Sequence, residues 1–255
     1  MSESRNAPWW SPEILAETER RIRSGADAAS GDIRNDYGSY KALVAGADPF
    51  TSGLYLHNEF DRRRVDTVCR DYRRIARSFS VDEPRKVADL GSGAGFTTDG
   101  LRRIWPHTSV VGFELSEDAV NFARTQWPEC TFHAGAIRPD VPLVDGPYDV
   151  ILCQEFYPFT RSRDHRDHET WLSFLRANLT ENGVALVMVT TSNDESINAN
   201  YAALRNRRSM RRILLAAPRL ARLLPYALSR LAGAVLAAVR PPWARSIYVV
   251  RPDGK

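Results

Sequence analysis

Three glycines and an acidic residue lie close together in the segment VADLGSGAGFTT, residues 87–98. Asp89 comes first, and the glycines are Gly91, Gly93 and Gly95. Glycine permits positive φ angles and lets a ligand approach the backbone closely. Glu114 closes the next apolar run, VVGFE, where a carboxylate can accept hydrogen bonds from both hydroxyls of a ribose. The spacing therefore predicts a nucleoside-cofactor pocket at the carboxyl ends of parallel strands.

The glycine spacing differs from that of a dinucleotide loop. A G-x-G-x-x-G loop places a third glycine against the helix and a pyrophosphate at the helix N-terminus. Here the pattern is G-x-G-x-G, and Phe96 occupies the next position. The charge of Asp89 would also repel a pyrophosphate, whereas it suits a ligand that carries an ammonium group. This pattern disfavours a nucleotide-dependent oxidoreductase.

The stretch from Asp89 to Gly95 resembles the first motif of class I S-adenosylmethionine-dependent methyltransferases. The resemblance covers about residues 85–191. It implies that S-adenosylmethionine is the cofactor and that the loop holds its amino-acid part, while Glu114 holds the ribose. The cofactor-binding residues that it implies are Asp89, Gly91, Ser92, Gly93, Gly95, Glu114, Leu115, Ala136 and Ile137. The sequence departs from the family after the third strand: the acid that usually meets the adenine amino group is absent until Asp140, so Ala136 and Ile137 are expected to pack on the ring.

Candidate acceptor-side residues follow the strand expected at 147–153. Groups just past the carboxyl end of a strand face the ligand crevice of an open α/β sheet. Glu155 is a candidate to orient or deprotonate the acceptor, and His165 and His168 lie in a charged stretch from which an imidazole can act as a base. The alternative for both histidines is a solvated, helix-capping role, and for Glu155 a structural hydrogen bond. The predicted substrate-binding residues are Tyr157, Phe159 and Arg161.

Alternating strand and helix signals predict the framework that positions these groups. Strands are expected at 86–90, 109–114, 130–134, 147–153, 184–190 and 246–250. Helices are expected at 12–29, 58–79, 96–105, 116–127 and 167–179, the last one ending at the Asn182-Gly183 turn. The pattern predicts an α/β fold with a doubly wound, mostly parallel sheet, N-terminal helices and a helical, Arg-rich insertion before the last strand. Within one domain we expect an N-terminal helical segment (1–84), the cofactor-binding core (85–191), the Arg-rich segment (192–245) and a final strand with its tail (246–255).

Composition limits the class of protein. The 255 residues suffice for one α/β domain with additions. The three cysteines, Cys69, Cys130 and Cys153, are widely spaced, which argues against a disulfide framework or a metal site and is consistent with a reducing cytoplasm. The chain begins without the basic start and apolar run of a signal peptide, so a cytoplasmic location is expected.

The positive charge of the chain is concentrated near its C-terminus. Between Ser196 and Pro252 there are eleven arginines and no acidic residue, although the formal net charge of the whole chain is only +4. Arginines interleaved with apolar residues are typical of helices packed on a sheet, of a lid over an anionic acceptor, or of an interfacial helix. Peripheral membrane contact through 205–245 is one of these three interpretations. Nucleic-acid binding is not favoured, because no recognised module or aromatic interleaving accompanies the charge.

Together these features predict S-adenosylmethionine-dependent methyl transfer to a small-molecule acceptor. An oxygen acceptor is favoured, on a sugar-containing, anionic or lipid-linked metabolite. The alternative is a non-catalytic cofactor-binding protein or membrane-surface adaptor of the same fold, because a fold does not fix an activity.

Overall fold

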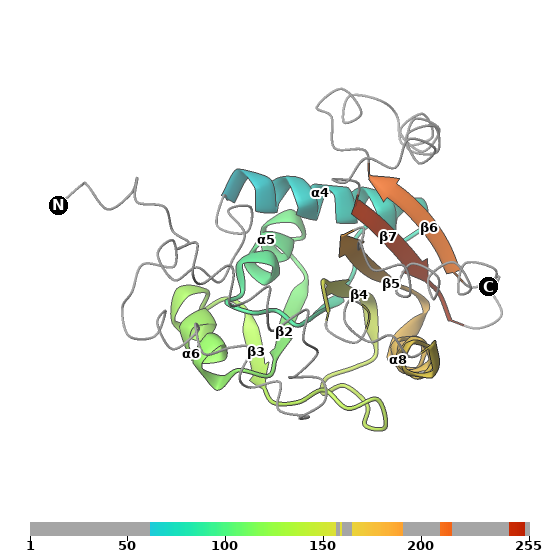
Figure 1. Cartoon of the computed structure of the whole chain (residues 1–255). Coiled ribbons are helices and arrows are strands. Elements are labelled where there is room, and N and C mark those ends of the chain that lie inside the picture. The colour runs from blue at the N-terminus through green and yellow to red at the C-terminus, as the bar shows by residue number, and fades with distance from the viewer. Residues whose placement is uncertain (1–61, 157–158, 160–164, 191–209, 216–244, 253–255) are drawn as a thin grey trace, which may run out of the picture. The chain divides into compact units, whose positions relative to one another are not determined.

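The structure is a computed structural model, and it describes residues 62–156, 159, 165–190, 210–215 and 245–252. The described elements follow one another as α4 (Arg62–Ser78), β1 (Lys86–Leu90), α5 (Phe96–Ile104), β2 (Ser109–Glu114), α6 (Glu117–Gln126), β3 (Thr131–Ala134), β4 (Tyr148–Gln154), α8 (His165–Ala177), β5 (Leu179–Thr190), β6 (Met210–Leu215) and β7 (Arg245–Val250) (Figure 1). The predicted alternation of strands and helices is confirmed over 86–190. The helix predicted at 12–29 lies outside the described residues.

The chain divides into two compact units. The first unit comprises Met1–Asp71 and Ser92–Ile137, and the second comprises Tyr72–Gly91 and Arg138–Lys255. Helix α4 contributes its first residues to one unit and its last residues to the other. Its buried side chains recur at helical spacing along one stripe: Val65, Cys69, Tyr72, Ile75 and Ala76.

In the second unit the strands are ordered β1-β4-β5-β7-β6. Strands β1, β4 and β5 are parallel, whereas β7 runs antiparallel to both β5 and β6. Helix α8 packs against β5 and β7 (Figure 1). Parallel strands are buried on both faces and therefore read as continuous apolar runs, which is the pattern of KVADL in β1 and YDVILCQ in β4.

A register shift between β4 and β5 corrects one sequence expectation. Tyr148 pairs with Leu179, but Val150 pairs with Val184. The side chain of Asp149 occupies the irregularity, where its Oδ1 accepts the Thr180 hydroxyl at 3.0 Å. The prediction that a turn at Asn182-Gly183 precedes the strand is wrong, because β5 already begins at Leu179. Gly183 fits there because an added Cβ would lie 2.9 Å from the Tyr148 carbonyl oxygen.

Strand β6 corrects a second expectation. Met210–Leu215 pair antiparallel with Arg245–Val250, so the prediction of a helical segment over 192–245 is wrong at these six residues. A second strand therefore accompanies the predicted final strand. The rest of the Arg-rich segment, 192–209 and 216–244, lies outside the described residues.

In the first unit β2 and β3 are parallel, with Val111 paired to Thr131 and Glu114 to Ala134. Helix α5 packs on β2, and α6 packs on β2 and β3 (Figure 1). The predicted cap of α6 is confirmed, because the Ser116 hydroxyl accepts the backbone N–H of Ala119 at 3.3 Å. Among the described residues no helix combines the length and apolar character needed to cross a bilayer.

Candidate functional site

The glycine loop that follows β1 has the backbone conformation that its sequence predicts. Gly91, Gly93 and Gly95 have φ angles of 74°, 53° and 82°. These angles lie in the left-handed region, which side chains with a Cβ rarely adopt. Gly95 is also the N-cap of α5, so the helix begins directly from the loop. The loop therefore needs glycine at three positions, because the backbone has a positive φ at each of them.

The structure brings Glu114 and Gly93 into direct contact within the first unit. Glu114 ends β2 with its side chain only 3% exposed. Its Oε2 accepts the backbone N–H of Gly93 at 2.9 Å, and its Oε1 accepts the backbone N–H of Ser116 at 2.9 Å. A carboxylate offers about four lone-pair positions, and these two bonds leave the others for a ligand.

Burial changes the acidity of this carboxyl group. Desolvation raises the pKa of Glu114 above its ordinary value of 4.5, and the hydrogen bonds from Ser116 and Gly93 oppose that rise. The ionised form of this carboxyl group is therefore costly in the folded protein, and the two backbone hydrogen bonds offset part of that cost. Such perturbed groups concentrate at functional sites.

Backbone contacts hold the loop to β2. The N–H of Ser92 donates to the carbonyl of Phe113 at 3.0 Å, and the N–H of Gly95 donates to the carbonyl of Ser92 at 3.0 Å. The Ser92 hydroxyl is buried and has no hydrogen-bond partner among the described residues. It lies beside Gly112 of β2, where an added Cβ would approach it to 2.8 Å. A buried hydroxyl of this kind retains the capacity to bond a polar ligand.

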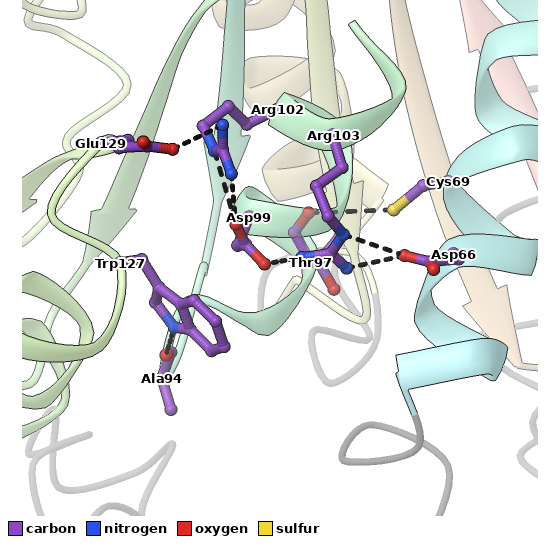
Figure 2. A network of polar contacts seen from close by, with 9 residues as sticks. All are labelled: Asp66, Cys69, Ala94, Thr97, Asp99, Arg102, Arg103, Trp127 and Glu129. Carbon is purple, nitrogen blue, oxygen red and sulfur yellow. Dashed lines mark hydrogen bonds and ion pairs between the residues drawn. The ribbon is translucent and has the colours of Figure 1, made fainter. Parts of the chain in front are cut away.

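Trp127, at the end of α6, supports the loop from the other side. Its indole Nε1–H donates to the carbonyl of Ala94 at 2.9 Å (Figure 2). Its ring packs edge-on to Phe96, with centroids 5.4 Å apart, and fills the space beside Gly95. The sequence did not predict this role, because Trp127 lies about thirty residues beyond the loop and carries no motif of its own.

A charged network anchors the helix that the loop begins. Asp99, only 4% exposed, pairs with Arg102 and Arg103 in the next turn of α5. Arg103 also bonds Asp66 of α4 at 2.6 Å, and Arg102 bonds Glu129 at 2.6 Å (Figure 2). Removing one member of a buried pair leaves an uncompensated charge, so this network constrains α5 and with it the end of the loop.

We expect Trp127→Phe to weaken cofactor binding more than it lowers stability. The substitution keeps most of the buried ring and removes the single donor to Ala94, a loss of about 0.5–1.5 kcal/mol for a neutral hydrogen bond. Binding by calorimetry and thermal unfolding would be measured together. Trp105→Phe is the control, since Trp105 is also a C-cap tryptophan, at the end of α5, although it is fully buried and Trp127 only partly so. Equal effects of both variants on binding would contradict a positioning role for Trp127.

The predicted adenine side lies where β3 ends. Gly135 has a φ of 135°, and its N–H donates to the backbone carbonyl of Glu114 at 2.9 Å. An added Cβ at Gly135 would meet no atom within 4 Å, so open space lies beside the backbone here. Ala136 is exposed, and Leu115 and Ile137 are half-buried.

Asp89 and Gly91 belong to the second unit. Asp89 is 1% exposed on β1. Burial raises the pKa of the Cys153 thiol well above its ordinary value, and the negative charge of Asp89 raises it further, which places that carboxylate near Cys153 of β4. All three cysteines are free and buried. Gly91 is exposed, and Phe156 is the nearest side chain to it.

The predicted catalytic residues of the second unit lie in different environments. Glu155 is exposed directly after β4, and its backbone N–H donates to the carbonyl of Met188 at 3.0 Å. His165 is the first residue of α8, and its Nδ1 lies 3.5 Å from Oε1 of Glu169. Both side chains can reach solvent.

His168 and Phe159 are both buried, which the sequence did not predict. His168 lies within α8, in agreement with the helix predicted at 167–179, but it is 0% exposed. Its ring packs against Phe159, with centroids 5.9 Å apart, and Phe159 is itself 0% exposed. Both rings therefore belong to the core, and burial argues against their predicted catalytic and substrate-binding roles. Tyr157 and Arg161 lie outside the described residues.

Comparison with known proteins gives a consistent assignment. Residues 87–183 match the family model described as a methyltransferase domain. The chain is 29% identical over 117 residues to a trans-aconitate 2-methyltransferase of Afipia carboxidovorans, which covers 46% of this chain and 43% of the relative. It is also 29% identical over 180 residues to the trans-aconitate 2-methyltransferase of Rhodopseudomonas palustris strain HaA2. This alignment covers 71% of this chain and 66% of the relative. The chain thus spans less than half the length of the first relative.

Similar solved structures extend the match beyond the family model. The plantazolicin methyltransferase BpumL, in complex with SAH and a substrate analogue, aligns over 94% of this chain and 98% of its own, with a TM-score of 0.54 and 13% identity. Similarity at this level shows the fold, and it confirms the predicted class I fold with its mostly parallel sheet. With its glycine loop, the acid that ends β2 and the family match over residues 87–183, the chain contains a methyltransferase domain with the class I fold.

Proposed function

We propose that this protein transfers a methyl group from S-adenosylmethionine to an oxygen of a small-molecule acceptor. The observation that carries the proposal is Glu114, whose buried carboxylate ends β2 and accepts the Gly93 N–H of the glycine loop at 2.9 Å. An acid at this point of a βαβ unit is suited to ribose hydroxyls. Its contact with the loop connects that role to the residues that precede α5.

The residues of the first unit fit an adenosyl group. Glu114 retains lone pairs after its two backbone hydrogen bonds, the Ser92 hydroxyl is buried without a described partner, and open space lies beside Gly135. Ala136 and Ile137 would border the adenine. When bound, S-adenosylmethionine supplies an activated methyl group on a positively charged sulfur. The task of the protein is to hold that group in line with the acceptor, since proximity and orientation supply much of the acceleration in such displacements.

Calorimetric titration with S-adenosylhomocysteine tests the cofactor assignment. We expect saturable binding at one site per chain. Folded protein that shows no binding at millimolar ligand would overturn the proposal. If the cofactor binds but a broad acceptor panel shows no turnover, the alternative of a non-catalytic cofactor-binding or adaptor protein is the correct one.

The acceptor class follows from charge and from the relatives. Proteins named trans-aconitate 2-methyltransferase act on an anionic carboxylate, and eleven arginines in this chain lie between Ser196 and Pro252. We therefore propose an anionic metabolite as the acceptor, in preference to an uncharged sugar or a lipid-linked one. Mass spectrometry of a deletion strain, in a search for metabolites one methyl group lighter, would identify it. Release of methanol by mild base would show that the product is a carboxylate ester.

Glu155 is our candidate for the residue that orients or deprotonates the acceptor. With a hydroxyl acceptor, Glu155→Gln is expected to lower kcat by about 10²-fold or more, which is the usual contribution of a general base. The affinity for S-adenosylhomocysteine should stay within about twofold, because the substitution preserves shape. His165→Gln is the matched comparison. A loss of kcat in His165→Gln alone would transfer the base role to His165, and a carboxylate acceptor, already ionised at neutral pH, would leave both variants active.

A further inference from the structure

Phe156 contacts the glycine loop across two neighbouring strands of the second unit. An ideal Cβ built on Gly91 would lie 3.1 Å from Cδ2 and 3.9 Å from Cε2 of the Phe156 ring. The ring therefore packs directly on the backbone where β1 ends. Gly91 and Phe156 are sixty-five residues apart in the sequence, and no motif connects them.

A strained backbone directs this ring. Glu155, which immediately precedes Phe156, has a φ of 50°, in the left-handed region that a residue with a Cβ enters at a cost. Its N–H is fixed by the carbonyl of Met188 at 3.0 Å, and the Phe156 carbonyl accepts the N–H of Phe159 at 3.0 Å. The chain thus turns sharply after β4 and then turns again. The hydrogen bonds on both sides maintain a conformation that sends Phe156 back to the end of β1.

Other aromatic rings support Phe156 from behind. Trp171 of α8 meets it edge-on, with centroids 5.3 Å apart and an interplanar angle of 84°. The buried ring of Phe159 lies 6.4 Å away. Phe156 itself is half-buried. A ring supported in this way is held in one place and still offers surface to a ligand.

The register of the strands brings the end of β4, which Phe156 follows, beside the end of β1. Leu90 of β1 pairs with Cys153 of β4, so the carboxyl ends of these parallel strands are adjacent. Ligands of open α/β sheets bind at such ends. The glycine loop, which is proposed to hold the methyl donor, begins after β1. The candidate acceptor-side residues follow β4. Because the sulfonium of the donor must face the acceptor, a side chain that joins the two strand ends would border it.

We propose that Phe156 recognises the positive charge of the sulfonium and so makes the protein prefer S-adenosylmethionine over its demethylated product. This inference rests on the proposed function. An aromatic ring within about 6 Å of a cation attracts it through the ring quadrupole, whereas a neutral thioether gains only packing. Preference for the charged donor also favours release of the product after transfer, because the product lacks that charge.

The test compares two ligands in one variant. Phe156→Leu keeps an apolar side chain and removes the π system. We expect the Kd of S-adenosylmethionine, measured by calorimetry without acceptor, to rise about 3- to 20-fold, while the Kd of S-adenosylhomocysteine changes less than about twofold. Phe156→Tyr should restore the wild-type ratio of the two Kd values. Equal weakening of both ligands would mean that Phe156 only packs against the loop, and it would overturn the proposal, as would an unchanged Kd for both.

Phe174→Leu is the matched control. Phe174 is a buried phenylalanine of α8 that contacts Trp171 edge-on, with centroids 5.4 Å apart. Its substitution should lower the melting temperature and leave the ratio of the two Kd values unchanged. If wild-type protein binds neither ligand, the proposed function fails. If it binds both and Phe156→Leu leaves the ratio unchanged, only the inference about Phe156 fails.

Discussion

Gly95→Ala is expected to lower the free energy of unfolding by about 2–4 kcal/mol and to abolish cofactor binding. Two costs add up at this position. The φ of 82° is strained for any residue with a Cβ. The new methyl group would also lie 2.7 Å from Cδ1 of Trp127 and 2.8 Å from Cζ of Phe132, both of which are ring atoms with little freedom to move. Chemical denaturation and calorimetric titration would measure the two effects.

Two other glycines separate strain from steric conflict. Gly135→Ala places a Cβ at a φ of 135° with no atom within 4 Å, so it reports strain alone. Gly100→Ala places a Cβ 2.7 Å from Sγ of Cys69 and from Cγ1 of Val65, in a helix of ordinary φ, so it reports crowding alone. Each should cost less than Gly95→Ala. A Gly95→Ala protein with wild-type stability would show that the loop does not require glycine there.

Glu114→Gln is expected to weaken binding of S-adenosylhomocysteine by about 1.5–3 kcal/mol, the cost of losing hydrogen bonds to a charged group. In the wild-type protein one carboxylate oxygen of Glu114 accepts the backbone N–H of Gly93, and the other accepts that of Ser116. A glutamine has only one accepting oxygen, so one N–H would face an amide donor. Glu117→Gln, at an exposed position on α6, is the matched control and should leave the affinity unchanged. Wild-type affinity in Glu114→Gln would contradict the proposed ribose contact.

The same carboxyl group predicts a pH dependence with opposite signs for stability and for binding. Because burial raises the pKa of Glu114 above 4.5, the folded state holds its proton more tightly than the unfolded state does. Its stabilising contribution is therefore fully present below pH 4.5 and is lost as the pH rises through the folded-state pKa. The proposed ribose contact requires the ionised form, so the affinity should fall as the pH decreases through that raised pKa. Titrations across this range should show the decrease in wild type, and Glu114→Gln should show little of it.

The sequence predicted best those features whose signals are local. The bounds of β1 and β2 and the starts of α5 and α6 follow from apolar runs, glycines that permit positive φ, and a serine cap. The start of β5 could not be predicted in this way. Asn182-Gly183 has the sequence of a turn, but the bulge opposite Asp149 of β4 accommodates it within the strand. The local turn signal gave the wrong start for β5 because pairing with β4 determines the backbone conformation at these residues.

The positions of side chains also divide into those that local sequence predicts and those that packing determines. The place of Glu114 at the end of β2 was predictable because it follows from the order of elements along the chain. His168 has the residue type and the charged neighbours of a catalytic base, yet the rotation of α8 buries it against Phe159. Helix rotation depends on which face packs on β5 and β7, and that packing is a property of the whole unit.

The sequence by itself determined the methyltransferase domain and the conformation of the glycine loop from Asp89 to Gly95, with Glu114 at the end of the next strand. These are set by backbone conformation and strand order, which neighbouring residues encode. Only the tertiary structure decided that Trp127 supports Ala94 and that Phe156, behind the strained Glu155, packs on Gly91. Both contacts join residues far apart in the chain. Their geometry arises when separate strands and helices pack, and no stretch of sequence specifies it alone.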